Sequence, residues 1–82
     1  MKKTEIAVGC RRGRHIRYSL LTTIGEDGSP RYGAAVAYAG EETLVPDITA
    51  DFPKALSLLE LLHQGSVLPA ALRDVVEDWL LL

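Results

Sequence analysis

This 82-residue chain lacks several features that would indicate its function. Cysteine occurs once, at Cys10, so no intramolecular disulfide can form. No run of about 18 apolar residues is present, which excludes a membrane-spanning helix. The first residues also lack the apolar stretch of about 7–15 residues that a secretory signal needs. We therefore expect a soluble protein of a reducing cytoplasm.

Catalytic and metal-binding motifs are absent as well. The sequence has no glycine-rich phosphate loop, nucleophile-elbow serine or His-Glu metal helix. Cys10, His15 and His63 lack the spacing of a zinc site. Cys10 and His15 flank a predicted turn, where neighbouring arginines would favour a thiolate, so a thiol enzyme is one alternative. Our prediction is a protein with no catalytic residue, no metal and no cofactor.

Positive charge is concentrated near the start of the chain. Residues 1–17 carry six lysines and arginines against one glutamate, a net charge of +5, whereas residues 18–82 carry a net charge of −7. Four of the arginines lie close together, at Arg11, Arg12, Arg14 and Arg17. This dipolar distribution is typical of a binding module with one basic edge.

The sequence leaves three interpretations of the arginine cluster. The guanidinium groups could be solvated and face the acidic part of the chain, bind carboxylates of a partner protein, or bind the phosphates of a nucleic acid. Nucleic-acid binding would gain from stacking by Tyr18 and Tyr32, but both share the parity of the predicted core face. The acidic isoelectric point is also unlike that of most nucleic-acid-binding domains.

The first half of the chain alternates with the period of β-strands. Three strands are predicted, with turns at residues 11–14 and 25–30, and Gly13 is expected at positive φ in a four-residue loop. Residues 43–45 could add a short fourth strand, which Pro46 would confine to an edge. The predicted core face consists of Ile6, Val8, Ile16, Tyr18, Leu20 and Val36.

The opposite face of the predicted sheet carries small side chains. Its members are Ala7, Gly9, Ser19, Gly33, Ala35 and Ala37. Either this face is solvated and thinly covered, as is common in antiparallel sheets, or the small residues allow close approach by a second sheet or subunit.

The second half of the chain is predicted to be helical. A first helix begins near Asp51-Phe52-Pro53 and ends before Gly65. A second helix opens at Pro69 and continues through Trp79, with an apolar stripe at helical spacing. Because the connection is short, we expect the two helices to pack antiparallel as a hairpin.

Three residues of the second helix are candidates for partner binding. Asp74 and Asp78 lie one turn apart, where like charges repel, so a basic partner or the arginine cluster itself would offset the repulsion. Trp79 is either an ordinary core aromatic or an exposed anchor for a partner. The surplus of leucines also makes a homodimer an option.

The segments Arg31-Tyr32-Gly33, Pro46-Asp47-Ile48-Thr49 and the closing Leu72–Leu80 resemble a small family of uncharacterised clostridial-type proteins. The resemblance covers most of the chain, but its motifs are short and structural in character. It implies a cytoplasmic protein of a Gram-positive bacterium and supplies no activity, cofactor or functional residue.

Taken together, the sequence predicts one α+β domain over residues 1–82. A three- to four-stranded antiparallel meander (residues 1–45) precedes a two-helix hairpin (residues 51–82) packed on one face. The predicted function is a small non-catalytic protein-interaction or regulatory module, with no membrane partner; the alternative is a nucleic-acid-binding accessory protein. The predicted partner-binding residues are Arg11, Arg12, Arg14, Arg17, Asp74, Asp78 and Trp79.

Overall fold

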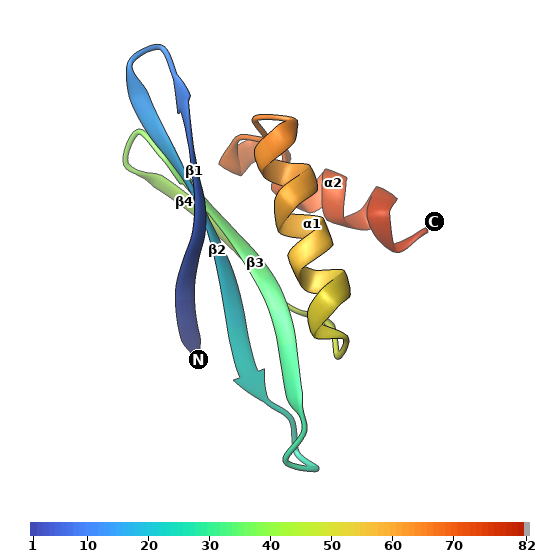
Figure 1. Ribbon diagram of the computed structural model, residues 1–82. Helices are drawn as coiled ribbons and strands as arrows, with labels where there is room; N and C mark the ends of the chain where they lie inside the picture. Colours follow the sequence, from blue (N-terminus) through green and yellow to red (C-terminus); the bar gives the residue numbers. More distant parts are fainter. Residues whose placement is uncertain (82) are drawn as a thin grey trace.

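The computed structural model describes residues 1–81 and contains one antiparallel sheet followed by helices. The strands pair in sequence order: β1 (Lys2–Arg11), β2 (Arg14–Ile24), β3 (Pro30–Tyr38) and β4 (Glu41–Thr49). The helices are α1 (Phe52–Gln64), a 3₁₀ helix (Pro69–Ala71) and α2 (Leu72–Leu80). Figure 1 shows both α-helices on the same face of the sheet. The predicted α+β fold class is confirmed.

A β-bulge in β1 changes which of its side chains face the helices. The register against β2 shifts between Glu5 and Ala7, so Ile6 is an extra residue. Because side chains alternate along a strand, the extra residue turns Ala7 and Gly9 toward the helices and Val8 away from them. The prediction that Ile6 and Val8 belong to the core is therefore wrong, and both are exposed. The other predicted core-face residues are buried: Ile16, Tyr18, Leu20 and Val36.

The hydrophobic core lies between the sheet and the helices. The helices contribute a buried set consisting of Ala55, Leu58, Leu59, Leu62, Leu72 and Val76. Each fully buried leucine contributes about 1.5–3 kcal/mol of transfer free energy. Tyr18 is fully buried and its hydroxyl donates a hydrogen bond of 3.1 Å to the Val67 carbonyl. Burial raises the pKa of Tyr18 above its ordinary value.

The ends of α1 follow the predicted signals. The Asp51 side chain caps the helix by accepting a 3.1 Å hydrogen bond from the Lys54 N–H, and Pro53 occupies the first turn. Gly65 caps the other end. The second helix starts at Pro69, as predicted, but its first turn is 3₁₀.

The relative orientation of the helices differs from the predicted antiparallel hairpin. Figure 1 shows α2 running across α1 instead of alongside it. The buried residues Leu72 and Val76 join the core that the sheet and α1 form, so α2 contacts the sheet as well as α1. A short connection alone does not fix the crossing angle, because the apolar stripe of α2 also has to reach β4.

The last strand is longer than predicted, because it tolerates Pro46 in an irregular segment. Residues 46–48 lie opposite the single residue Gly33, and Asp47 has a φ of 59°. A side chain on Gly33 would overlap the backbone of Val45 and Pro46. Gly33 is therefore required for β4 to cross this position, and the strand continues to Thr49.

The sheet face opposite the helices is closed by its own side chains. Lys3 of β1 and Glu42 of β4 form an ion pair of 2.7 Å across β2 and β3. In a flat sheet these outer strands would be about 14 Å apart, so the pair indicates a strongly curved sheet. Beneath the side chains of this face, Ser19, Leu21 and Ala35 are buried without a helix above them. Among residues 1–81, no helix has the length and apolar character needed to cross a membrane.

Candidate binding site at a basic hairpin tip

The β1–β2 hairpin ends in a two-residue turn that carries the arginine cluster. Arg11 and Arg14 pair as the last residues of the two strands, so the predicted four-residue loop is in fact Arg12 and Gly13 alone. Their φ angles are 52° and 77°, which is the backbone of a type I′ turn. The expected positive φ of Gly13 is confirmed. We call Arg11, Arg12 and Arg14 the basic tip.

The guanidinium groups of the basic tip have no carboxylate partner within residues 1–81. All three arginines are exposed. Three other cations of the sheet are paired: Lys3 with Glu42, Arg17 with Glu5, and Arg31 with Asp47. The basic tip is therefore a local concentration of positive charge that the described part of the chain does not neutralise.

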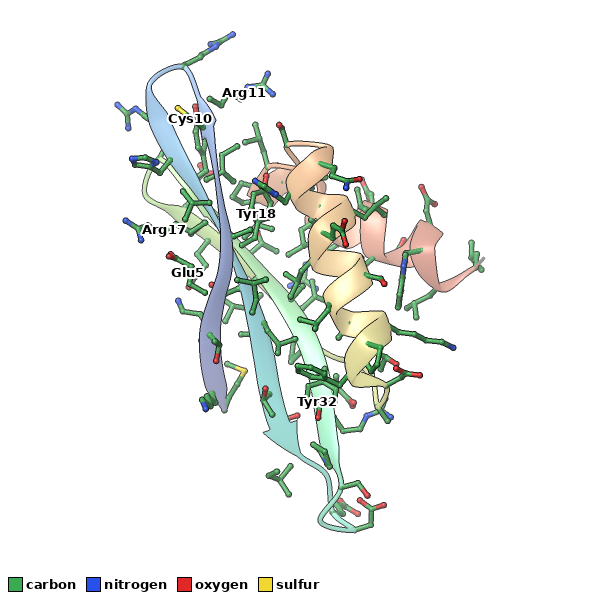
Figure 2. All side chains as sticks on the ribbon, viewed as in Figure 1. Glu5, Cys10, Arg11, Arg17, Tyr18 and Tyr32 are labelled. Carbon is green, nitrogen blue, oxygen red and sulfur yellow. The ribbon has the colours of Figure 1, made fainter. Side chains whose placement is uncertain are left out.

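Arg17, the fourth arginine of the predicted site, lies apart from the basic tip. It occupies the opposite parity of β2 from Arg14, so its side chain is on the face without helices. There it forms an ion pair of 2.9 Å with Glu5 (Figure 2). Three of the four predicted arginines are thus brought together, and the fourth is engaged elsewhere.

A second hairpin tip lies at the same end of the sheet. The β3–β4 turn consists of Ala39 and Gly40, with φ angles of 52° and 83°, and it is followed by Glu41 and Glu42. Figure 1 shows both turns at the same end of the molecule. We call Glu41 and Glu42 the acidic tip. Sequence reasoning missed it, although Ala-Gly between two alternating runs was a usable turn signal.

A hollow lies beside the acidic tip, and one hydrogen bond joins the base of the basic tip to β3. The hollow has a volume of about 310 Å³ and is lined by His15, Arg17, Ala37, Tyr38, Ala39, Gly40, Glu41 and Glu42. The Tyr38 hydroxyl donates to the Arg11 carbonyl oxygen at 3.2 Å. This contact ties the base of the basic tip to β3 and limits its movement relative to the sheet.

Cys10 and His15 face each other directly across the hairpin. They are paired residues of β1 and β2, as expected from their positions beside the turn, and both are exposed. Within residues 1–81, no three His, Cys, Asp or Glu side chains are grouped closely enough to hold a metal ion.

The two tyrosines that the sequence offered for stacking on bases are not presented at the basic tip. Tyr18 is fully buried, and Figure 2 shows it between the sheet and α1. Tyr32 is half-buried and packs edge-on against Phe52, with ring centres 5.4 Å apart. The parity that predicted core positions for both tyrosines is confirmed for Tyr18 and holds in part for Tyr32.

The predicted residues of α2 form a separate surface. Asp74 and Asp78 are exposed, and neither forms an ion pair with the basic tip or with any other described residue. Trp79 is half-buried against the core, so its role as a core aromatic holds in part. It also lines a cavity of about 410 Å³ together with Ile48, Thr49, Lys54, Ser57 and Leu80.

Comparison with protein families identifies the family of the chain. Residues 2–82 match the model of a family of unknown function, DUF6514. The chain belongs to this family. A comparison with curated proteins found no match, and neither did a comparison with solved structures. Since DUF6514 has no described activity, the function has to be inferred from the surfaces of the fold.

Proposed function

We propose that this DUF6514 protein is a small non-catalytic interaction module whose basic tip binds an acidic surface of a partner protein. One observation carries the proposal: three exposed arginines within four residues have no carboxylate partner among residues 1–81, whereas Lys3, Arg17 and Arg31 of the same sheet do. A guanidinium group binds a carboxylate through two parallel hydrogen bonds, which favours acidic side chains as ligands.

The hairpin supplies a well-positioned support for these arginines. Regular pairing continues from Ala7–Tyr18 to Arg11–Arg14, directly up to the turn. The hydrogen bond from Tyr38 holds the base of the tip. Because the backbone is fixed before binding, the partner has to order side chains and not the loop, which lowers the entropic cost of association.

The acidic tip and α2 narrow the choice of partner. A nucleic acid at the basic tip would find neither Tyr18 nor Tyr32 available for stacking, and the exposed Glu41 at the turn of the other hairpin would repel its phosphates. A protein with mixed charge can complement both tips. Asp74, Asp78 and Trp79 would then be a second contact surface, and a second copy of the chain remains an alternative partner.

We further infer a cytoplasmic setting in a Gram-positive bacterium. This inference rests on the resemblance carried by Arg31-Tyr32-Gly33 and the closing helix, and on the single cysteine, Cys10.

The test measures binding of two polyanions, poly-L-glutamate and single-stranded poly-dT, to the protein at low and physiological salt. The decisive variant is R11Q/R12Q/R14Q. K54Q/R73Q is the control, because it removes cations that also have no ion pair among residues 1–81 but lie on the helices. We expect poly-L-glutamate to bind the wild type and the control, and to bind the tip variant about tenfold or more weakly.

A loss of affinity in the control in proportion to its two removed charges, against three in the tip variant, would show that net charge alone drives binding, and would contradict a site at the tip. Tighter, tip-dependent binding of poly-dT would overturn the choice of an acidic protein and favour the nucleic-acid alternative. Absence of binding to either polymer at low salt would contradict the proposal altogether, since unpaired arginines attract flexible polyanions most strongly there.

A further inference from the structure

We propose that β1 accepts an extended, acidic-ended peptide of the partner protein as a fifth strand of the sheet. This proposal rests on the proposed function, because the acidic end of the peptide would be bound by the basic tip. The regular segment of β1 from Ala7 to Arg11 would form the backbone ladder, and Arg11, Arg12 and Arg14 would lie at its end.

The outer edge of β1 is available for pairing. β1 is the first strand in the order of the sheet, and within residues 1–81 it pairs with β2 alone. Figure 1 looks toward this edge, and no other segment passes in front of it. No backbone hydrogen bond from residues 12–81 outside the ladder reaches β1. An edge strand presents unpaired N–H and C=O groups, which are a template for an added strand.

The opposite edge of the sheet is unsuited to the same role. In β4, Pro46 has no N–H to donate, and Asp47 has a φ of 59°. Residues 46–48 bulge opposite Gly33, so the outer edge does not continue as a regular ladder. The regular part of β4, residues 41–45, is as long as that of β1 but begins with Glu41 and Glu42, so an acidic peptide would pair better with β1.

Charge determines which peptide fits. Lys2 and the basic tip bracket the strand, and none of these four cations is paired within residues 1–81, whereas Glu5 is already paired with Arg17. Two copies of β1 pairing antiparallel about their centre would place Lys2 of each near Arg11 of the other. Like charges facing each other across strands are destabilising, so the edge disfavours a second copy and favours an acidic segment.

The surroundings of the segment suit a peptide that alternates apolar and polar residues. Val8 is 42% exposed on the face without helices, where it can pack against one side chain of an added strand. On the helix face, Ala7 and Gly9 are small, and the position of a Cβ on Gly9 would be 3.7 Å from His63 of α1. Side chains of the peptide on that face would lie beside the end of α1 with little steric obstruction from β1 itself.

The experiment uses end-blocked peptides with a segment of about eight residues in which valine and threonine alternate. Three glutamates are attached at one end of this segment, the amino end in one peptide and the carboxyl end in another. In two further versions every second backbone amide is N-methylated. One version carries the methyl groups on the odd-numbered residues and the other on the even-numbered residues. A strand donates from alternate residues along each edge, so an added strand uses one set of N–H groups. We expect the unmodified peptide to bind, one methylated version to bind about tenfold or more weakly, and the other to bind nearly as before. Bound peptide should also slow amide hydrogen exchange within residues 7–11.

The outcomes separate this inference from the proposed function. Equal binding of both methylated versions, with the affinity lost in R11Q/R12Q/R14Q, would overturn strand addition while leaving the acid-binding tip intact. Binding that ignores the tip variant, or no binding of any peptide, would overturn strand addition; in that case the poly-L-glutamate test alone decides whether the tip binds acidic partners. A dimer of the free protein with slowed exchange along β1 would also overturn it, since a second copy would then occupy the edge.

Discussion

The two hairpin tips at one end of the sheet have the same backbone and opposite charge. Arg12-Gly13 and Ala39-Gly40 have first φ angles of 52° each and second φ angles of 77° and 83°. One turn is bounded by arginines, and the other is followed by Glu41 and Glu42. The Ala39 turn shows that this geometry needs no arginine.

The difference separates what the fold requires from what binding requires. Both turns meet their backbone requirement with a glycine at the second position, which adopts positive φ without steric cost. Glu42 of the acidic tip is tied to Lys3 and so contributes to the sheet, whereas the basic tip has no such partner among residues 1–81. We infer that the arginines serve an external ligand.

The largest expected effect tests whether the two turns are equivalent as backbone. Gly13→Ala and Gly40→Ala each place a Cβ at positive φ in open space, so strain is the main cost. We expect each to lower the free energy of unfolding by about 1 kcal/mol, and by the same amount within about 0.5 kcal/mol. Urea denaturation measures both. A clearly larger loss at Gly13 would mean that the basic tip has a structural role that the acidic tip lacks.

Tyr18 lies on the same strand as Arg14 but differs from it, because the hydroxyl group of Tyr18 stabilises the fold through a hydrogen bond. Tyr18→Phe removes the hydrogen bond to the Val67 carbonyl, and we expect a loss of about 1 kcal/mol in unfolding free energy. R11Q/R12Q/R14Q should by comparison change stability by less than about 0.5 kcal/mol.

Tyr18→Phe is also expected to change how the stability of the fold depends on pH. Burial raises the pKa of Tyr18, so the folded protein keeps this proton at a pH where the unfolded chain has released it. Its contribution to stability is complete below the unfolded pKa of about 10 and is lost as the pH rises through the folded pKa. Tyr18→Phe should therefore flatten the alkaline decline of stability. An unchanged decline would contradict its assignment to Tyr18.

The smallest effect concerns the ion pair of the acidic tip. Glu42→Gln breaks the exposed pair with Lys3, and we expect a loss of at most about 1 kcal/mol that disappears in about 1 M salt. Arg12→Gln should cause no loss at either salt concentration. Thermal unfolding of both variants at two salt concentrations makes the comparison. A salt-sensitive loss in Arg12→Gln would show that the basic tip is paired in solution.

The sequence predicted the features that local chemistry determines. Asp51, Pro53 and Gly65 marked the ends of α1 because capping and φ restrictions act within one turn. The arginine cluster was placed on a hairpin tip because Gly13 supplies the positive φ of the turn. These signals depend on neighbouring residues alone.

Features that depend on distant contacts were not predictable in the same way. The extra residue Ile6 has no turn or glycine to mark it, yet it reverses the parity of the rest of β1. The full length of β4 depends on Gly33 accommodating the bulge at Pro46, and the ion pair between Lys3 and Glu42 depends on the curvature of the sheet. Which arginines form ion pairs also depends on contacts between residues far apart in the sequence, such as Arg17 with Glu5 and Arg31 with Asp47.

Binding of acidic ligands at the basic tip is tested by following the backbone amide resonances of the unmodified protein while poly-L-glutamate is added. We expect the largest shifts in residues 10–15, at the basic tip, and little movement of the amides of α2 and of the acidic tip. Largest shifts on the helices, or equal shifts over all cationic positions, would contradict the claim that the basic tip is the binding site.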